Sequence, residues 1–205
     1  MVEDMRSGVR NAYSRRAAES SEHLGSMEAV HPSDRQLVTN WADQITGPAI
    51  DAGCGPGHWT GYLARLGVAV RVIDLVPEFM AHARASYSGI AFDVGAVDEL
   101  QVESGTMGGV LAGHSLIHCE PDEIQVSLQE FARLLRPGSD LLLGFFEGPT
   151  VRKFDHSVVA AYWWPVGELC DKLRAVGFDV IETHMRTGPQ HRPHGAIRAR
   201  RTASP

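Results

Sequence analysis

A glycine-rich turn is the part of the sequence whose residue types and spacing point most directly to chemistry. It covers residues 51–57 and places one acidic residue and three glycines at alternate positions: Asp51, Gly53, Gly55 and Gly57. Glycines at a strand end let a ligand approach the backbone, because no Cβ stands in the way. In an open α/β sheet, ligands bind beyond the carboxyl ends of the strands. The turn therefore predicts a ligand-binding loop between a strand and a helix.

A carboxylate at the end of the next predicted strand is the second anchor. Asp74 follows Gly57 by 17 residues, and its two oxygens can accept hydrogen bonds from both hydroxyls of a ribose. The glycine spacing differs from the dinucleotide fingerprint G-x-G-x-x-G, because His58 stands where the third glycine belongs. The pattern therefore favours a nucleoside ligand and counts against a dinucleotide.

Alternating strand and helix patterns predict the frame that holds these residues. Apolar or β-branched runs predict seven strands, at 49–52, 68–73, 90–93, 109–112, 141–146, 178–181 and 197–199. Helical spacing predicts helices at 33–46, 60–66, 77–86, 122–135 and 169–176. Strands that alternate with helices imply crossover connections and a mainly parallel sheet with helices on both faces.

Two segments lie outside this alternation. Residues 1–30 are polar, with few apolar side chains, and are expected to be an irregular lid that becomes ordered only against the rest of the protein or a ligand. Residues 183–195 are rich in His, Arg, Pro and Gly and are expected to form a loop between the last two strands, which would then make an antiparallel edge hairpin. The domain proper is predicted to span 31–205.

The order of these motifs resembles the class I, Rossmann-like S-adenosylmethionine-dependent methyltransferases. Residues 51–57 resemble motif I of that family, and Asp74 stands at its ribose-binding position. The run 134–138 (Leu-Leu-Arg-Pro-Gly) resembles the element before its fifth strand, and 164–178 its last helix-to-strand element. The resemblance covers residues 40–200 and implies a single α/β domain that binds S-adenosylmethionine and releases S-adenosylhomocysteine.

The resemblance also implies which residues contact the cofactor. They are Asp51, Gly53, Cys54, Gly55, Gly57, Asp74, Leu75, Gly95, Ala96, Val97 and His114. Ala96 departs from the family pattern, which often has an acidic residue there for the adenine amino group. Adenine recognition is therefore expected to rest on backbone groups at 95–97.

The acceptor side is expected to lie at the exits of the fourth and fifth strands. His118 matches a histidine of the small-molecule branch of the family, and His156 follows the fifth strand. We predict that one of these two histidines removes a proton from the acceptor, which requires a pKa near the working pH. Four further residues are predicted to contact the acceptor: Tyr13, Ser115, Tyr162 and Trp163. The arginines at 192, 198, 200 and 201 are interpreted as a solvated edge.

The composition counts against several other classes of protein. Of 205 residues 43% are hydrophobic and 21% charged, with a net charge of −6, which counts against a general nucleic-acid binder. Three cysteines without C-x-x-C spacing predict reduced thiols and neither disulfide nor metal site. The chain shows no signal sequence or membrane-spanning run, so a cytoplasmic location is expected.

Methyl transfer to an oxygen or nitrogen of a small molecule is the function that these patterns favour. The acceptor, the pathway and the oligomeric state are not encoded in any motif of the chain. Two alternatives stay open: an NAD-dependent oxidoreductase on a Rossmann sheet, and a non-catalytic module that binds S-adenosylmethionine. Titration with NADH and with S-adenosylhomocysteine separates the first from the prediction, and turnover across an acceptor panel separates the second.

Overall fold

The computed structural model describes residues 2–17, 26–188 and 191–203. Its helices are α1 (Val2–Ser14), α3 (Pro32–Ala42), α4 (His58–Arg65), α5 (Pro77–Ser86), α6 (Ile124–Leu134) and α7 (Val166–Ala175). Its strands are β1 (Ala49–Ala52), β2 (Val70–Asp74), β3 (Ala91–Val94), β4 (Met107–Gly113), β5 (Leu135–Glu147), β6 (Arg152–Phe154), β7 (Ala161–Trp164), β8 (Phe178–Gly188) and β9 (His191–Arg201).

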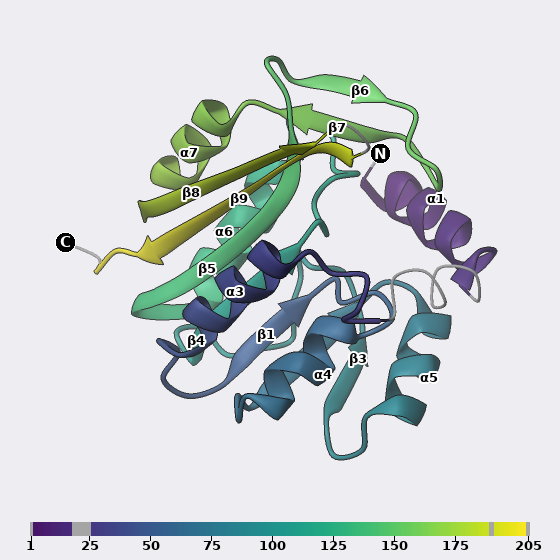
Figure 1. The fold of residues 1–205 in the computed structure, drawn as a ribbon, viewed down its shortest axis with the longest axis vertical. Helices are drawn as coiled ribbons and strands as arrows, with labels where there is room; N and C mark the ends of the chain where they lie inside the picture. Colours follow the sequence, from purple (N-terminus) through teal and green to yellow (C-terminus); the bar gives the residue numbers. More distant parts are fainter. Residues whose placement is uncertain (1, 18–25, 189–190, 204–205) are drawn as a thin grey trace.

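One sheet contains all of these strands (Figure 1). The order along its main path is β3-β2-β1-β4-β5-β7-β6, and β9 lies between β5 and β8. Strands β1 to β5 pair in parallel, whereas β9 runs antiparallel to both of its neighbours. The parallel strands end at one edge of the sheet, which brings the loops after β1, β2 and β4 together.

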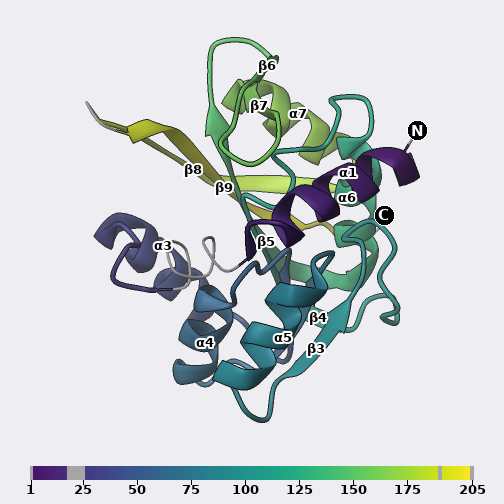
Figure 2. The same cartoon turned by 90° about the vertical axis from the view of Figure 1, so that its right-hand side faces the viewer.

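Helices cover both faces of the sheet, as the sequence predicted (Figure 2). Strand β1 is buried on both sides, so its side chains pack into two hydrophobic clusters, one on each face of the sheet. Ile50 points toward α6 and α7, where it joins a cluster with Phe131 and Leu173. Ala49 faces the opposite way and packs with Trp41 of α3 and other residues of that face. Burial of both cores holds the loop after β1 at a defined place.

The mainly parallel α/β fold is confirmed, and the structure adds two strands to the seven that were predicted. Strands β6 and β7 form a short antiparallel hairpin beside the end of β5. The expected loop at 183–195 is wrong, because 183–188 and 191–195 belong to the long strands β8 and β9. Residues 189–190 lie outside the described residues. The antiparallel edge hairpin of the last two strands is as predicted, with β8 at the edge and β9 paired with β5.

Residues 2–14 form helix α1 rather than an irregular segment, and this helix is packed against the rest of the protein, where order was expected. The helix places Tyr13 edge-on against Phe79 of α5, with ring centroids 5.9 Å apart. Arg6 forms an ion pair with Asp98, and Ser14 donates a hydrogen bond to Glu78 at 2.7 Å. Tertiary contacts thus stabilise a helix that its polar sequence alone does not predict. Residues 18–25 of the expected lid lie outside the described residues.

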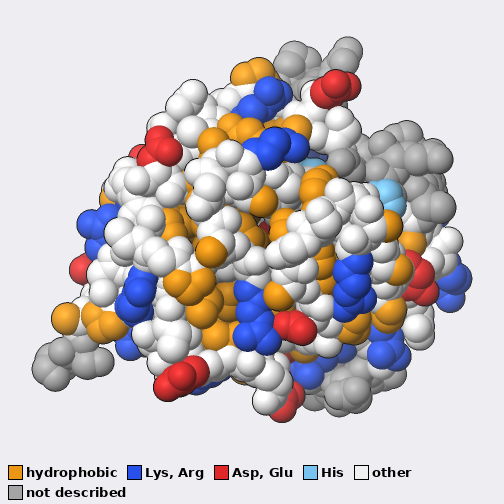
Figure 3. Space-filling view, turned by 90° about the horizontal axis from the view of Figure 1, so that it is seen from below, with side chains coloured by type: hydrophobic (Ala, Val, Ile, Leu, Met, Phe, Trp, Pro, Cys, Tyr) orange, Lys and Arg blue, Asp and Glu red, His pale blue; other side chains and the backbone are white. Residues whose placement is uncertain are grey.

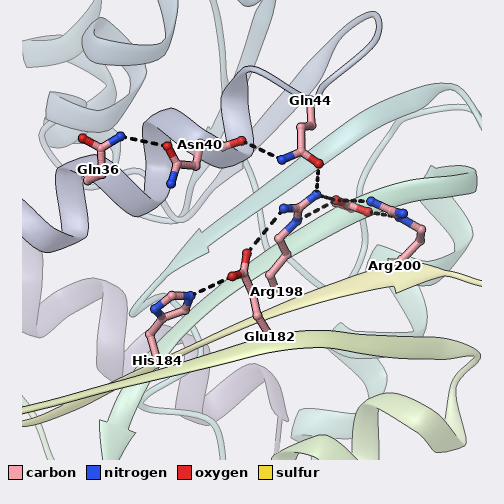
Figure 4. A network of polar contacts seen from close by, with 8 residues as sticks. Gln36, Asn40, Gln44, Glu182, His184, Arg198 and Arg200 are labelled. Atoms are coloured by element: carbon pink, nitrogen blue, oxygen red, sulfur yellow. Dashed lines mark hydrogen bonds and ion pairs between the residues drawn. The ribbon is translucent and has the colours of Figure 1, made fainter.

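A buried carboxylate joins the inner strand β9 to the rest of the sheet. The Asp140 side chain is 8% exposed and accepts hydrogen bonds from Arg198 at 2.5 and 2.7 Å and from Arg200 at 2.7 and 3.1 Å. Arg198 also reaches Gln44 beyond α3 and Glu182 on β8, so one network connects helix and strands (Figure 4). Arg198 is therefore a buried partner of a carboxylate rather than part of the solvated edge that was expected, whereas the Arg200 side chain keeps 42% of its surface exposed. Arg201 likewise bonds the carbonyl groups of Ala132 and Gly177.

The molecular surface in Figure 3 shows Lys and Arg side chains scattered among hydrophobic and uncharged groups rather than gathered into one patch. None of the helices among the described residues is long and apolar enough to cross a membrane.

The network around Asp140 yields a stability prediction. Asp140→Ala removes the buried carboxylate partner of the Arg198 guanidinium, and breaking a buried pair in this way costs about 3–5 kcal/mol. The free energy of unfolding, measured in urea, should fall by that amount. Asp171→Ala is the control, because the Asp171–Arg174 pair is exposed, and its loss should change stability by less than about 0.5 kcal/mol. Equal effects of the two substitutions would contradict the assigned role of Asp140.

Candidate active site

The loop after β1 has the backbone geometry that only glycine adopts readily. Gly53 and Gly55 have φ values of +73° and +55°. A Cβ on Gly53 would collide with the side chain of Ser115 in the loop after β4, so this glycine lets the two loops pack closely. A Cβ on Gly55 would meet no atom within 4 Å. The backbone at Gly55 is thus open to a ligand.

The carboxylate of Asp74 holds this loop in position. One of its oxygens accepts a hydrogen bond from the Gly55 amide at 2.8 Å, and the other accepts one from the Val76 amide at 2.9 Å. Each carboxylate oxygen has a second lone-pair site, so both can still accept a hydroxyl. Burial raises the pKa of Asp74, and the backbone amides oppose this rise. Asp74 lines the pocket, as predicted.

Asp51 lies beneath the loop rather than in the pocket, which corrects its expected contact with a ligand. Its side chain accepts a hydrogen bond of 2.6 Å from Thr60 on α4 and is 2% exposed. Burial, opposed by the bond from Thr60, raises the pKa of Asp51 to about 7. Asp51 therefore fixes the start of α4 against β1.

A pocket of about 340 Å³ opens where the loops after β1, β2 and β4 meet. Of the residues predicted to bind the cofactor, seven line it: Gly53, Cys54, Gly55, Asp74, Leu75, Val97 and His114. Gly95 and Ala96 instead line a neighbouring hollow with Leu75 and with Arg6, Ser7 and Arg10 of α1. Gly57 lines neither hollow, because it caps the N-terminus of α4, where a Cβ would crowd Ala83 and Tyr87.

His118 and Tyr13 meet at the wall of the pocket. His118 Nδ1 lies 2.9 Å from the carbonyl oxygen of Ala160, and Nε2 lies 2.9 Å from the Tyr13 hydroxyl. A carbonyl only accepts, so Nδ1 carries the hydrogen and Nε2 of the neutral ring accepts from Tyr13. Burial lowers the pKa of His118 and raises that of Tyr13 to about 12, which keeps both groups uncharged. The pair joins α1 to the loop after β4.

His156 lines the same pocket, with its ring centroid 5.4 Å from that of His118. Its Nδ1 lies 3.5 Å from the Val158 amide, a long contact, and Asp155 beside it is exposed to solvent. Burial lowers the pKa of His156 to about 4, and His118 and Arg192 add to the effect. The pKa of His156 therefore lies below the expected range near neutrality, because burial and the guanidinium of Arg192 disfavour the charged ring.

A histidine that the sequence patterns did not single out completes this wall. His194 on β9 lines the pocket, and its Nδ1 lies 3.0 Å from Nε2 of His114. Burial and His194 lower the pKa of His114 to about 3. Phe146 at the end of β5 packs beside both rings, with its centroid 5.2 Å from that of His114 and 5.3 Å from that of His194. The histidines within the expected loop 183–195 were the available signal for this cluster.

The predicted acceptor-binding residues divide into two pairs. Tyr13 and Ser115 line the pocket, and the buried Ser115 hydroxyl has no hydrogen-bond partner within the described parts of the chain. Tyr162 does not, because alternation along β7 turns it into the core beside α6 and α7, where it bonds Glu120. Trp163, which does not line the pocket, stacks on Phe154 at 4.4 Å and meets Phe146 edge-on, with centroids 5.7 Å apart. These two contacts with the acceptor are therefore not supported.

Four apolar residues of the pocket wall were also not predicted from the sequence, because they belong to segments that were interpreted as core or lid. Val9 of α1, Trp59 of α4, Phe79 of α5 and Ile117 all face the pocket. Among the described His, Cys, Asp and Glu residues, no three gather in an arrangement able to hold a metal ion.

Fold and site together define a Rossmann-like domain with a nucleoside-sized pocket at the carboxyl ends of its strands. Residues 49–138 match a family model described as a methyltransferase domain. Over 122 residues the chain is 33% identical to the ubiquinone biosynthesis O-methyltransferase of Xanthomonas oryzae pv. oryzae, covering 57% of this chain and 50% of that protein. The chain thus spans about half the length of this relative.

Solved structures share the fold at low identity. One is the 1,6-didemethyltoxoflavin-N1-methyltransferase of Burkholderia thailandensis with bound 1,6-didemethyltoxoflavin and S-adenosylhomocysteine, with a TM-score of 0.75, 22% identity, and coverage of 94% of this chain and 88% of that one. Another is the magnesium protoporphyrin IX methyltransferase of Synechocystis with bound S-adenosylmethionine, with a TM-score of 0.77, 18% identity, and coverage of 97% of both. The chain therefore has the Rossmann-like fold of these structures, and its residues 49–138 match a methyltransferase domain.

The raised pKa of Asp51 yields a pH prediction. In the unfolded chain an aspartate titrates near about 3.9, whereas in the folded protein the pKa of Asp51 is about 7. The stability that its protonated form contributes is complete below about pH 4 and is lost as pH rises through about 7. In urea unfolding, Asp51→Asn should show less decline in stability over this range than the parent protein. Parallel pH curves would contradict the assignment, and Asp93→Asn on the exposed end of β3 is the control.

Proposed function

We propose that this protein transfers a methyl group from S-adenosylmethionine to an oxygen atom of a small-molecule acceptor and releases S-adenosylhomocysteine. The observation that carries the proposal is the position of Asp74, whose carboxylate fixes the open backbone of Gly55 and faces the same pocket. The histidines 118 and 156 lie at the wall of that pocket. Oxygen is favoured as the acceptor atom because a hydroxyl needs a base, and because the curated relative is an O-methyltransferase.

The residues of the pocket fit the cofactor at several points. Asp74 offers two acceptor sites for ribose hydroxyls, and the missing Cβ of Gly55 leaves room for the ligand to pass. The buried Ser115 hydroxyl has no hydrogen-bond partner among the described residues, which favours a polar ligand group beside it. The backbone at Gly95 and Ala96 lies open on the adjoining hollow, where Ala96 brings no carboxylate to the adenine amino group.

The bound cofactor supplies an activated methyl group on a sulfonium centre. The protein's own task is then to align the acceptor, and a good alignment lowers the barrier by about 7–11 kcal/mol. His156 is the better candidate for the base, because its Nδ1 has only a long contact with Val158. His118 has both nitrogens engaged, by Ala160 and Tyr13, and acts as a positioning residue that holds Tyr13 of α1 over the pocket.

Two other functions make different demands on the site. A dinucleotide-dependent oxidoreductase would need a glycine where His58 stands, and that side chain lines the pocket. A module that binds the cofactor without turnover would need no base beside the acceptor, so it would bind S-adenosylhomocysteine but leave every acceptor in a broad panel unmethylated.

Cofactor affinity tests the nucleoside end of the site. Asp74→Asn keeps the size of the side chain but replaces one acceptor oxygen with an NH₂ group and removes the charge. A hydrogen bond to a charged group contributes about 1.5–3 kcal/mol, so calorimetry should show S-adenosylhomocysteine binding at least about tenfold weaker. Asp93→Asn, an equally conservative change on an exposed carboxylate, should leave the affinity unaltered. Unchanged binding to the Asp74 variant would refute the assigned role.

Turnover tests the acceptor end. His156→Ala should lower kcat by about 10²–10⁴ while S-adenosylhomocysteine affinity survives. His118→Ala should instead weaken cofactor binding more than kcat, because α1 loses its hydrogen bond through Tyr13. In the parent enzyme, kcat/KM should stay high at pH 6 and fall only as pH drops through about 4, where His156 becomes protonated. His82→Ala, on the exposed side of α5, is the control. Full kcat in the His156 variant would leave alignment alone as the mechanism.

A further inference from the structure

A second hollow, of about 330 Å³, opens beside the pocket and shares Leu75 with it. Leu75 directly follows Asp74, so this hollow begins next to the proposed ribose anchor. The turn after β3 and helix α1 supply the rest of its lining, which consists of Gly95, Ala96, Glu99, Arg6, Ser7 and Arg10. The function proposed above uses only the backbone of the turn, and the charged side chains of this hollow require a separate explanation.

The turn that carries Glu99 is fixed at both ends. The Gly95 amide donates a hydrogen bond of 3.0 Å to the Asp74 carbonyl, which ties the turn to the end of β2. At the other end, the Leu100 amide donates to the Glu130 carboxylate of α6 at 2.8 Å, and the Leu100 side chain is buried in the core. These contacts hold the backbone of Glu99 at a defined place beside the ribose anchor.

Two carboxylates follow Ala96 in this turn, and they differ in their partners. Asp98 forms an ion pair with Arg6 of α1, and its side chain is only 13% exposed. The Glu99 side chain forms no hydrogen bond or ion pair with any residue that the structure describes, and it is exposed where it lines the hollow. Of the two, Glu99 is therefore the carboxylate that a ligand in the hollow can reach.

The arginines of α1 that line the hollow have carboxylates beside them. Arg6 is paired as described above. A hydrogen bond from Ser14 lowers the pKa of Glu78 on α5, and the charge of Arg10 adds to this effect, which places Arg10 near that carboxylate. With Glu99 included, the positive charges around the hollow do not exceed the negative ones. An anion such as phosphate would need cations free to pair with it, so the hollow suits a neutral group that both donates and accepts hydrogen bonds.

Adenine is such a group. Its exocyclic amino group donates hydrogen bonds, and its ring nitrogens N3 and N7 accept them. A carboxylate only accepts, whereas guanidinium and hydroxyl groups donate, so Glu99 complements the amino group, and Arg10 and Ser7 complement ring nitrogens. The base and the sulfur of the cofactor are attached at opposite ends of the ribose. A cofactor with its ribose at Asp74 and its sulfur toward the histidines would direct its base to the hollow that shares Leu75.

We propose that the Glu99 carboxylate accepts a hydrogen bond from the exocyclic amino group of the cofactor's adenine and is a specificity-determining residue of the cofactor site. This inference rests on the proposed function, because it concerns the cofactor of the same site. The carboxylate that binds the amino group thus stands three positions after Ala96. The ion pair between Arg6 and Asp98 keeps the neighbouring carboxylate occupied, which leaves the amino group to Glu99.

The test uses the full chain and two ligands that differ at one position of the purine. One is S-adenosylhomocysteine, and the other is its purine-riboside analogue, in which a hydrogen replaces the amino group. Calorimetry should show the parent protein binding S-adenosylhomocysteine about tenfold more tightly, because the analogue cannot donate to the charged Glu99. This preference is measured on the parent protein alone, so it does not depend on the folding of any variant.

Glu99→Ala tests the assigned residue. It should weaken S-adenosylhomocysteine binding about tenfold and leave the affinity for the analogue unchanged, so that both ligands then bind alike. Damage to the fold would instead weaken both ligands, because they share every other group. Glu99→Gln keeps a neutral acceptor oxygen and should retain part of the preference. Glu103→Ala is the control, because Glu103 is an exposed carboxylate of the same connection that lines neither hollow.

Equal affinities of the parent protein for the two ligands would overturn this inference. So would a Glu99→Ala variant that keeps the full preference, whether or not it weakens both ligands. The proposed methyl transfer would survive these results, because each of them still records binding of S-adenosylhomocysteine. A parent protein that binds neither ligand would overturn the proposed function, and the assignment of Glu99 with it.

Discussion

The hydrogen bonds that Asp74 accepts from the amides of Gly55 and Val76 are the interaction on which the site depends. They tie the loop after β1 to the turn after β2, so two strand ends act as one rigid surface. The arrangement needs Gly53 and Gly55 at positive φ, and it needs Gly53 to lack a Cβ so that Ser115 can pack against it. A buried carboxylate satisfied by backbone amides thus stabilises a loop that carries no regular structure of its own.

The elements with clear local signals were predictable, and those that depend on distant partners were not. Strand β1 and helix α5 agree with the apolar periodicity and with Pro77 at the helix start. The polar residues 183–188 and 191–195 of β8 and β9 were interpreted as a loop, because nothing local shows that His194 pairs with Phe146 of β5, 48 positions earlier. Similarly, α1 is stabilised by contacts with α5 and the loop after β4, and its own sequence shows only scattered apolar residues.

The residues of the candidate site show the same difference between local signals and distant contacts. Gly55 and Asp74 were found from spacing, and the structure brings both to the pocket. Asp51 was assigned to the ligand because the motif does not reveal that Thr60 reaches back to it. Tyr162 and Trp163 were misassigned because adjacent strand residues face opposite sides, and a strand had not been predicted there. His194 was missed because only the pairing of β9 with β5 brings it beside His114.

The place of β9 in the sheet has a consequence for how the chain folds. Strand β8 pairs only with β9 among the described strands, and β9 must insert beside β5, whose residues are about 50 to 60 positions earlier along the pairing. Loop closure over such separations slows folding. During synthesis, β5 therefore has one bare edge, and Asp140 lacks its guanidinium partners, until residues 191–201 have emerged. The sheet is completed by one of its last segments to be made, and a chain halted before that point would present an unpaired strand open to aggregation.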